Sequence, residues 1–368
     1  MVEPEPLLWI GKNEVRWRHR RLLYFSGCDY FRLARDPQVA AAMRSALKEH
    51  GLNAAASRIT TGNQSIYHTL ESALARFFGA NAALLLPDGY LAPLAVAQAL
   101  RGEYTHALVD ELSHGALRDA ARLTGCPVRF FKHRNAADLA RIIARCGKKS
   151  RPLVLTDGLF AHDGSVAPLQ SYLKILPSRG LILVDDAHGG GVLGKNGQGT
   201  LAHENVRRGR IVQCITLSKA FGVFGGAVLA SPALQRKIIS ESWIFKGSTP
   251  LPPPLAGAAL MALKILRHEP QRRRRLEANT RWLRDVLRNA GWPMADLPGP
   301  IVRLPLLNAA DVRLLKKQLL AADIYPPFIN YGTAAPGVFR FVISSEHTRP
   351  DLNRVARVFV HFRCRRQN

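Results

Sequence analysis

The feature that most limits the possible fold is a series of short apolar segments that alternate with helical stretches between Gly51 and Ser231. Several segments are apolar almost throughout, which is typical of strands buried on both faces of a sheet. Because amphipathic stretches separate most of them, the pattern predicts an α/β domain with a mostly parallel sheet. The expected strands read NAALLLP, HALVDE, CPVRFFKH, RPLVLTDG, GLILVDDAHG, RIVQCITLS and GGAVLAS.

A proline cluster in the sequence STPLPPPLAG ends this pattern, and a long helical stretch follows it. We therefore expect an N-terminal arm and helix over residues 1–45, a large α/β domain over 46–258 and a smaller α+β domain over 259–368. Before the first expected strand, the sequence predicts a helix over 37–50 that ends at Gly51.

The formal net charge is +25, from 52 lysines and arginines against 27 acidic residues. Such a charge suits nucleic acid, a phosphate-bearing cosubstrate or an acidic carrier protein. Because zinc-finger spacing and clustered RNA-binding aromatics are absent from the sequence, nucleic acid is not the expected partner. The densest basic segment, 271–291, places Leu276, Leu283 and Leu287 at helical spacing, which predicts a helix with a solvated arginine face.

The apolar runs are far shorter than the roughly 18 residues that a membrane helix needs. The start of the sequence resembles neither a signal peptide nor a transit peptide. Five widely spaced cysteines predict reduced thiols, with neither a disulfide framework nor a metal site. These features lead us to expect a cytoplasmic protein that neither enters a membrane nor binds a metal.

One lysine lies where a parallel sheet binds its ligands. Lys219 follows the apolar segment RIVQCITLS, and ligands bind outside the carboxyl ends of such strands. The segment GLILVDDAHG ends on Asp185, Asp186 and His188, one strand–crossover–strand unit before Lys219. We therefore expect both acids and the imidazole at the same sheet edge as Lys219.

A lysine, a carboxylate and a phosphate site together suit pyridoxal phosphate. This cofactor forms a Schiff base with a lysine, and a carboxylate such as Asp185 keeps its ring nitrogen protonated. The turn at 88–90, between an expected strand and helix, offers backbone N–H groups to the phosphate. Thr216 and Ser218 add hydroxyl groups beside Lys219.

The glycines at 189, 191 and 194 match the spacing of the G-x-G-x-x-G dinucleotide motif. In that motif the glycines open a helix directly after a strand. Here Asp185–His188 lies between the strand and the glycines, and the glycine-rich KNGQGT follows, so a nicotinamide site is the weaker interpretation.

Several motifs are similar to those of a known family. VDDAHGGGVLGKNGQG is similar to the pattern V-D-D/E-A-H-G-T-G-V-x-G-x-x-G-x-G, and TLSKAFGVFGG to a lysine motif, of the α-oxoamine synthases. TDGLFAHDGSVAPL, STPLPP and LLYFSGCDYFRLARDPQV resemble three further motifs of this family. The resemblance runs from about Tyr24 to Val360 and implies a fold-type I pyridoxal phosphate transferase, with a mostly parallel large domain and a smaller α+β C-terminal domain.

The resemblance implies catalytic and cofactor-binding roles for four residues. Lys219 would be the Schiff-base lysine, and Asp185 the partner of the ring nitrogen. His188 would lie near the 3-oxygen of the ring, and His114, in DELSHGALRD, would stack on the ring.

Other matching residues would bind the phosphate and the substrate. Gly89, Tyr90 and Thr216 match phosphate-binding positions, while Ser248 and Thr249 match residues that reach the phosphate of a second subunit, which implies a homodimer with shared sites. Arg340, in FRFVISSEHT, would bind the substrate carboxylate, because a guanidinium pairs bidentately with a carboxylate.

The chain also departs from the family pattern around the substrate. Cys28 stands where the family has a substrate-binding asparagine, and Arg32 where it has a glycine. Asp157 replaces a glutamate, Ala161 a serine and Gly190 a threonine, and a further motif reads NYGT at 330–333. The resemblance therefore supports the cofactor but does not identify the substrate.

The implied reaction is a decarboxylative Claisen condensation of an amino acid with an acyl-CoA or acyl carrier protein thioester. Its product is an α-amino ketone, as in synthases of the 8-amino-7-oxononanoate type. Two alternatives stay open: a pyridoxal phosphate-dependent aminotransferase or amino-acid lyase, and a non-catalytic basic paralogue that binds nucleic acid.

Overall fold

The computed structural model describes residues 5–330 and 337–367. The chain divides into two compact units, each described by itself. The larger unit comprises Leu33–Phe160 and Val166–Pro270, and the smaller unit comprises Met1–Arg32, Ala161–Ser165 and Gln271–Asn368. The domain limits expected at residues 45 and 258 stay a prediction.

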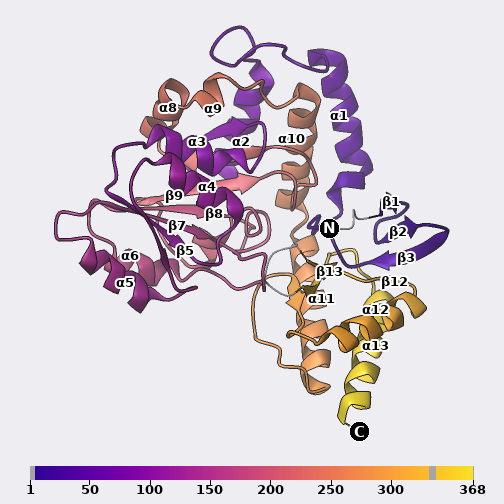
Figure 1. Ribbon diagram of the computed structural model, residues 1–368. Coiled ribbons are helices and arrows are strands. Elements are labelled where there is room, and N and C mark those ends of the chain that lie inside the picture. The colour runs from indigo at the N-terminus through magenta and orange to yellow at the C-terminus, as the bar shows by residue number, and fades with distance from the viewer. Residues whose placement is uncertain (1–4, 331–336, 368) are drawn as a thin grey trace. The chain divides into compact units, whose positions relative to one another are not determined.

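Within the described residues, seven strands of the larger unit form one sheet in the order β4-β10-β9-β8-β7-β5-β6 (Figure 1). β10 runs antiparallel to both neighbours, and the remaining neighbours pair in parallel. The predicted α/β class with a mostly parallel sheet is therefore confirmed. All seven segments predicted as strands form this sheet: β4 (Ala82–Leu86), β5 (His106–Asp110), β6 (Val128–Phe131), β7 (Pro152–Asp157), β8 (Leu181–Asp185), β9 (Ile211–Thr216) and β10 (Gly226–Ala230).

Alternate residues of the central strands enter two separate apolar cores. Leu155 and Leu183 belong to one core, whereas their neighbours Val154 and Val184 belong to the other. Because successive strand residues point to opposite faces, the continuous apolar segments cover both sides of the sheet. The helices of this unit are α1 (Pro37–His50), α2 (Ser65–Phe78), α3 (Leu91–Ala99), α4 (Gly115–Leu123), α5 (Ala136–Arg145), α6 (Leu169–Ile175), α7 (Thr200–His203), α8 (Pro232–Glu241), α9 (Trp243–Lys246) and α10 (Pro253–His268), with a 3₁₀ turn, η1, at Leu33–Arg35.

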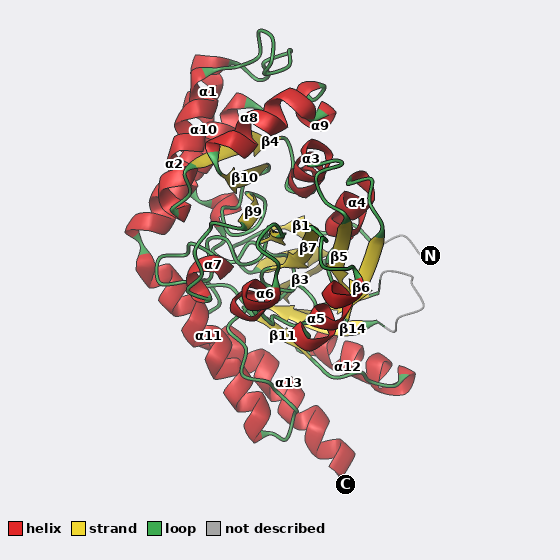
Figure 2. Ribbon diagram, turned by 90° about the vertical axis from the view of Figure 1, so that its left-hand side faces the viewer, coloured by secondary structure: helices red, strands yellow, loops and turns green. Residues whose placement is uncertain are grey.

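Helix α1 begins and ends where the sequence predicts. The Asp36 side chain accepts from the Gln38 N–H at its start, and Gly51 follows its last residue with a φ of 75°. α1 packs along α10, and the two run side by side in Figure 2. Gly257 allows this close approach, because a Cβ there would lie 2.5 Å from the Ala46 Cβ.

The smaller unit contains two further sheets, β1-β2-β3-β12 and β11-β14-β13. Its core includes Phe25, Leu283, Trp292 and Phe341. Its elements are β1 (Leu8–Trp9), β2 (Glu14–Trp17), β3 (Arg20–Tyr24), α11 (Pro270–Asn289), β11 (Ile301–Arg303), α12 (Ala309–Ala321), β12 (Ile324–Tyr325), β13 (Phe328–Ile329), β14 (Val338–Val342) and α13 (Arg349–Gln367).

The prediction that the arginines of α11 form a solvated face is wrong in part. Leu276, Leu283 and Leu287 are buried as expected, but Arg273 and Arg284 are buried too. Arg284 donates to the carbonyl oxygens of Gly299 at 2.7 Å and Ile301 at 2.8 Å. Arg284 was expected to be exposed because helical periodicity shows on which face of the helix a side chain lies. Periodicity does not show that a loop covers that face.

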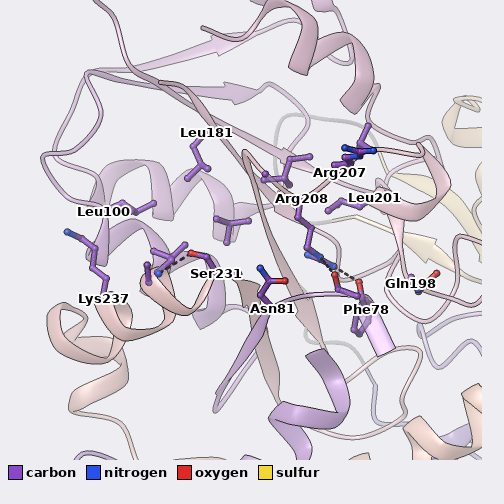
Figure 3. Close-up of a pocket in the computed structure, with 18 of the residues that line it drawn as sticks. Phe78, Asn81, Leu100, Leu181, Gln198, Leu201, Arg207, Arg208, Ser231 and Lys237 are labelled. Carbon is purple, nitrogen blue, oxygen red and sulfur yellow. Dashed lines mark hydrogen bonds between the residues drawn. The ribbon is translucent and has the colours of Figure 1, made fainter. Parts of the chain in front are cut away.

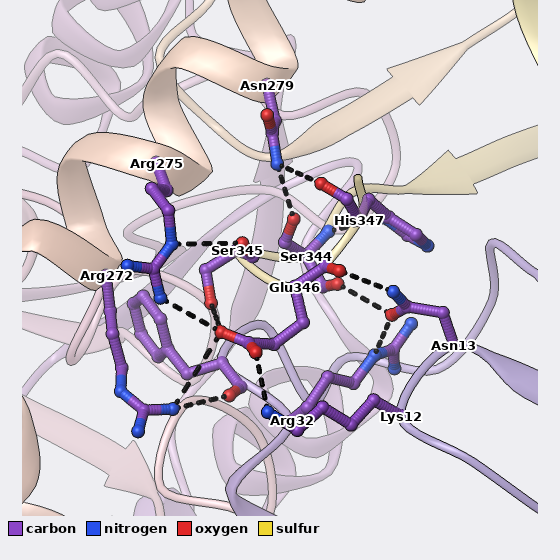
Figure 4. A network of polar contacts seen from close by, with 11 residues as sticks. Lys12, Asn13, Arg32, Arg272, Arg275, Asn279, Ser344, Ser345, Glu346 and His347 are labelled. Atoms are coloured by element: carbon purple, nitrogen blue, oxygen red, sulfur yellow. Dashed lines mark hydrogen bonds and ion pairs between the residues drawn. The ribbon is translucent and has the colours of Figure 1, made fainter. Parts of the chain in front are cut away.

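A carboxylate in the smaller unit joins the N-terminal arm to α11 (Figure 4). Glu346, whose side chain is 13 % exposed, accepts from Lys12 Nζ at 2.8 Å and from Arg275 Nη2 at 3.1 Å. Arg272 lies 3.9 Å away, and Asn13 donates to the Glu346 carbonyl at 2.6 Å. Burial raises the pKa of Glu346, but the hydrogen bonds from Lys12, Arg275 and Ser345 outweigh burial and lower the pKa overall.

In the described part of the chain, no helix has the length and apolar character needed to cross a membrane. The same residues contain no group of three or more His, Cys, Asp or Glu side chains that could hold a metal ion. All five cysteines are free thiols.

We expect Glu346→Gln to lower the free energy of unfolding by roughly 1–3 kcal/mol, because the cations around it lose a partly buried partner. Urea denaturation measures the effect. Glu277→Gln is the control: Glu277 pairs with Arg281 on the exposed face of α11, so it should change the free energy by about 0.5 kcal/mol or less.

Because the pKa of Glu346 is lowered in the folded chain, the stabilisation should be complete above the ordinary glutamate pKa and disappear as the pH falls below it. Equal effects of the two substitutions at neutral pH would contradict this role of Glu346.

Candidate active site

The register of the large sheet brings acidic residues to its carboxyl edge. Asp157, the last residue of β7, pairs with Asp185, the last residue of β8. On the other side of β8, Asp185 pairs with Cys214 of β9. Further along this edge, Gly226 of β10 pairs with both Thr216 and Leu86. The ends of β4, β7, β8 and β9 thus form one continuous edge.

Lys219 lies in the loop that leaves this edge after β9. The loop is closed by hydrogen bonds from the Leu217 N–H to the Gly225 carbonyl at 2.8 Å and from the Val223 N–H to the Leu217 carbonyl at 2.9 Å. Lys219 is half-buried. Its position is therefore fixed by backbone bonds on both sides.

Asp157 interacts electrostatically with Asp185 and Lys219. Its pKa is raised well above the ordinary value, first by burial and then by Asp185, while the His114 N–H and Lys219 act in the opposite direction. The structure thus places Asp157 within electrostatic reach of both residues that the sequence predicted at this edge, Asp185 and Lys219. Sequence analysis treated Asp157 only as a departure from the family pattern, although its position at a strand end was the available signal.

Asp185 and His188 are nearly buried at this edge, each with a residue exposure of 8 %. Asp185 Oδ1 accepts from the Ala187 N–H at 3.1 Å. The roles predicted for both residues stay predictions.

Asp186, the second acid expected at this edge, follows Asp185 directly, but its carboxylate is bound inside the fold. Its carboxylate is fully buried and accepts from the Thr200 N–H at 2.8 Å, the Thr200 hydroxyl at 2.6 Å and Gln213 Nε2 at 2.5 Å. Burial raises the pKa of Asp186 to about 6, against the hydrogen bonds from Thr200 and Gln213. Asp186 therefore anchors the turn after β8 to β9 and α7.

Three glycines enclose the Asp186 carboxylate. A Cβ on Gly158, Gly189 or Gly199 would lie 2.1–2.4 Å from one of its oxygens. The residues after Gly189 form turns and bends, and the next helix begins only at Thr200. Of the three motif glycines, Gly189 lies against this buried acid, whereas Gly191 and Gly194 lie against Ala220 and Ala202. The motif therefore does not form the helix start that a dinucleotide site needs.

His114 lies directly before α4, next to Asp157. Its N–H donates to Asp157 Oδ1 at 3.1 Å, and its Nδ1 accepts from the Ala116 N–H at 3.2 Å. The accepting Nδ1 leaves Nε2 as the donor nitrogen of the neutral ring. The ring is exposed and meets Tyr90 edge to face, with 5.9 Å between centroids.

The turn before α3 lies against the end of β9. A Cβ on Gly89 would lie 2.6 Å from both Cβ and Oγ1 of Thr216, and a Cβ on Gly226 would lie 2.6 Å from the Asp88 carbonyl oxygen. Thr216 Oγ1 donates to the Gly225 carbonyl at 3.1 Å and accepts from the Ser218 N–H at 3.1 Å. The predicted phosphate turn and its predicted hydroxyl are thus in contact.

Tyr90 is exposed at the start of α3, and its hydroxyl hydrogen-bonds Asp119 at 2.5 Å. Ser248 and Thr249 lie between α9 and α10, away from any helix or strand. The Ser248 hydroxyl donates to the Ile244 carbonyl at 2.5 Å, and Thr249 is exposed.

Arg340 and Cys28 belong to the smaller unit. Arg340, on β14, donates from Nη1 to the Ala161 carbonyl at 3.1 Å, while its buried Nε has no partner among the described residues. Cys28 hydrogen-bonds the buried Tyr30 hydroxyl, and burial, followed by Cys28, raises the Tyr30 pKa while Arg340 opposes the rise. Cys28, Tyr30, Ala161 and Arg340 therefore form one neighbourhood. The end of the NYGT motif, 331–333, lies outside the described residues.

Arg32 occupies the position where the family has a glycine, and its backbone conformation explains the family's preference. Its φ is 54°, in the left-handed region that most side chains avoid. Its guanidinium is 3 % exposed, donates to Asn13 and to the Tyr24 carbonyl at 3.2 Å each, and lies over the Trp9 ring. These contacts stabilise an arginine in a conformation that would otherwise disfavour it.

Asp186→Asn tests the free-energy cost of burying the charged Asp186 carboxylate. The folded chain holds a proton on Asp186 up to about pH 6, whereas an unfolded aspartate releases it near 3.8, so the free energy of unfolding falls as the pH rises through this window. The full effect is about 3 kcal/mol. An asparagine can accept from the Thr200 and Gln213 nitrogens and donate to the Thr200 hydroxyl.

We therefore expect Asp186→Asn to be more stable than the wild type at pH 8 and equally stable near pH 4, by denaturation at both pH values. Asp285→Asn, at an exposed ion pair of α11, is the control. A variant less stable than the wild type at pH 8 would show that the charge itself stabilises the fold.

Comparisons with known proteins identify the family of this chain. Residues 25–359 match the family model of aminotransferase class I and II. The chain is 37 % identical over 343 residues to the 8-amino-7-oxononanoate synthase of Thioalkalivibrio sulfidiphilus, which covers 91 % of this chain and 87 % of that relative. It is 36 % identical over 336 residues to the synthase of the same name from Methylococcus capsulatus, and the alignment covers 89 % of this chain and 86 % of that relative.

The fold is that of a solved Sphingomonas wittichii serine palmitoyltransferase, with a TM-score of 0.91, 25 % identity and coverage of 98 % of this chain and 92 % of that one. The expected fold-type I architecture is confirmed. The chain belongs to the aminotransferase class I and II family and, within it, to the α-oxoamine synthases, which are pyridoxal phosphate-dependent enzymes.

Proposed function

We propose that this chain condenses an amino acid with an acyl thioester, with loss of carbon dioxide and release of the thiol, to give an α-amino ketone. The reaction would be that of an 8-amino-7-oxononanoate synthase, the name carried by relatives that align over about nine-tenths of the chain. The observation that carries the proposal is the cluster of Lys219, Asp185 and Asp157 beside the contact between Gly89 and Thr216.

The residues at this edge fit pyridoxal phosphate. The Gly89–Thr216 contact leaves room for backbone only, and α3 begins two residues after Gly89. Backbone N–H groups at a helix start therefore lie beside the Thr216 hydroxyl, as a phosphate requires. Asp185 is nearly buried at the same edge, where a carboxylate is stabilised by a cationic ring nitrogen. Lys219 supplies the amine.

When bound, the cofactor supplies an electron sink that stabilises negative charge at the α-carbon of the amino acid. We assign Lys219 as the cofactor-bearing residue and as the base that takes the α-proton at Nζ. Asp185 would keep the ring nitrogen protonated, and His188 would contact the ring oxygen. His114 would cover the ring, with Nε2 free to donate a hydrogen bond.

For the substrate we propose Arg340 and Cys28. Arg340 has one guanidinium nitrogen on the Ala161 carbonyl and a buried Nε without a partner in the described residues, so it retains donors for a carboxylate. Cys28 takes the position of the family's substrate-binding asparagine. Its thiol is a weaker hydrogen-bond donor than an amide, so the substrate contacts here should differ from those of the family.

The acyl donor would be acyl-CoA or an acyl carrier protein, since either carries phosphate or acidic groups that suit the net charge of +25. We also propose a homodimer in which Ser248 and Thr249 reach the phosphate of the other subunit. The resemblance supports this assembly, and a monomer in sedimentation equilibrium would exclude it. A cytoplasmic location is proposed on the five free thiols.

Lys219→Ala tests the central assignment. We expect purified wild-type protein to show the visible absorption of lysine-bound pyridoxal phosphate, and the variant to lose it together with thiol release from an acyl-CoA in the presence of amino acids. The loss of turnover should exceed roughly a thousandfold, because the same amine binds the cofactor and moves the proton.

Lys195→Ala, at an exposed lysine, is the control and should keep both signals. Cofactor uptake with amino-group transfer to an α-keto acid, and without thiol release, would instead identify an aminotransferase. No uptake of pyridoxal phosphate by the wild type would overturn the proposal.

Gly89→Ala tests the phosphate turn. The added Cβ would meet Thr216 at 2.6 Å, so the turn must move and the affinity for pyridoxal phosphate should fall about tenfold or more. Gly209→Ala is the matched control, since a Cβ there meets no described atom within 4 Å. Fluorescence titration of the apoenzyme with the cofactor measures both, and equal affinities would place the phosphate elsewhere.

A further inference from the structure

A cavity lies at the end of the large sheet opposite Lys219 (Figure 3). Its volume is about 780 Å³, which is in the range of small-molecule sites. It is bounded by the first residues of β8 and β9, Leu181 and Ile211, and by the last residue of β10, Ala230. Asp185 and Thr216 end the same parallel strands at the other edge. The cavity is therefore separate from the proposed active site.

Most of the cavity wall is apolar. Phe78 at the end of α2, Leu100 after α3, Leu201 on α7 and Leu234 on α8 all contribute to it. An apolar wall of this extent suits an aliphatic or aromatic body and does not suit a fully polar ligand.

The charged residues of the wall are unbalanced. Within the described residues that line the cavity, Arg207, Arg208 and Lys237 stand against one carboxylate, Glu103. Lys237 is already paired with Glu103. Arg207 is exposed and has no ion pair or hydrogen bond from its side chain in the part of the chain that the structure describes. The two arginines therefore lack an acidic partner in the wall.

Arg208 is held by neutral acceptors alone. Its Nη2 donates to the Phe78 carbonyl at 2.8 Å and to Gln213 Oε1 at 2.5 Å, and its Nε donates to the Gly79 carbonyl at 3.2 Å. Its Nη1 is buried without a partner among the described residues. Burial lowers the Arg208 pKa to about 10, against the charge of Asp186, so the group stays cationic at neutral pH.

Asp186 acts on Arg208 only across Gln213, and Arg208 makes no ion pair. A largely buried cation without an ion pair costs free energy, which an anionic ligand would offset. We propose that this cavity binds a carboxylate on an apolar chain, of the medium-chain fatty acid type, with its head group at Arg207 and Arg208. The chain lies against the apolar wall.

Calorimetric titration of the holoenzyme with decanoate tests the proposal. We expect one decanoate to bind per chain, and its affinity to fall about tenfold in Arg207→Gln, which removes a cation, and in Ala233→Trp, which fills the cavity from an exposed position on α8. Arg236→Gln is the matched control, because Arg236 lies on the same helix outside the cavity lining and should bind as the wild type does.

Two further titrations complete the test. One shows whether decanoate binds at the cavity or at the active site, and the other shows whether the carboxylate contributes to binding beyond the apolar chain. Lys219→Ala should bind decanoate unchanged, even if the proposed reaction proves wrong, and decanamide should bind at least about tenfold more weakly than decanoate. The proposal is overturned if decanoate fails to bind, if both cavity variants bind as the wild type does, or if only Lys219→Ala loses binding. Equal binding of decanamide, or binding of inorganic phosphate alone, would also overturn it.

Discussion

The burial of carboxylates at the carboxyl edge of the seven-stranded sheet is the constraint on which the larger unit depends. Asp157 and Asp185 are paired in register, and Asp186 follows directly. Each buried acid costs free energy unless donors or cations compensate it. Asp157 receives the His114 N–H and interacts with Lys219, while Asp186 is held by Thr200 and Gln213. Lys219, the amine that the proposed chemistry needs, therefore also compensates the buried Asp157.

The glycines around this edge follow from the same constraint. Two close approaches leave no space for side chains: Gly158, Gly189 and Gly199 surround the Asp186 carboxylate, and Gly89 faces Thr216. Gly189, which belongs to both this set and the nucleotide-like spacing, is therefore explained by its close approach to an internal acid. A glycine at such a position indicates that another group lies close to its Cα, and does not identify that group.

The sequence predicted the strands, α1 and the sheet edge to which Asp185 and Lys219 belong, because each rests on a local pattern and on the geometry of parallel sheets. The antiparallel direction of β10 was not predicted, since an apolar segment carries no sign of its direction. The burial of the Asp186 carboxylate was not predicted, because its partner Gln213 lies in the middle of an apolar strand, and side-chain direction beyond a strand end depends on such tertiary partners. The burial of Arg284 depends on loop carbonyls that no periodicity reveals.

A chain of hydrogen bonds connects the two ends of the large sheet. Arg208, at the cavity, donates to Gln213 Oε1, and Gln213 Nε2 donates to Asp186, the residue after Asp185. A glutamine suits this position because its amide accepts from a cation and donates to an anion at once. Gln213 separates the charges of Arg208 and Asp186, which would otherwise neutralise each other directly. The arginine consequently keeps its charge unpaired at the cavity, while the carboxylate is fixed beside the catalytic edge.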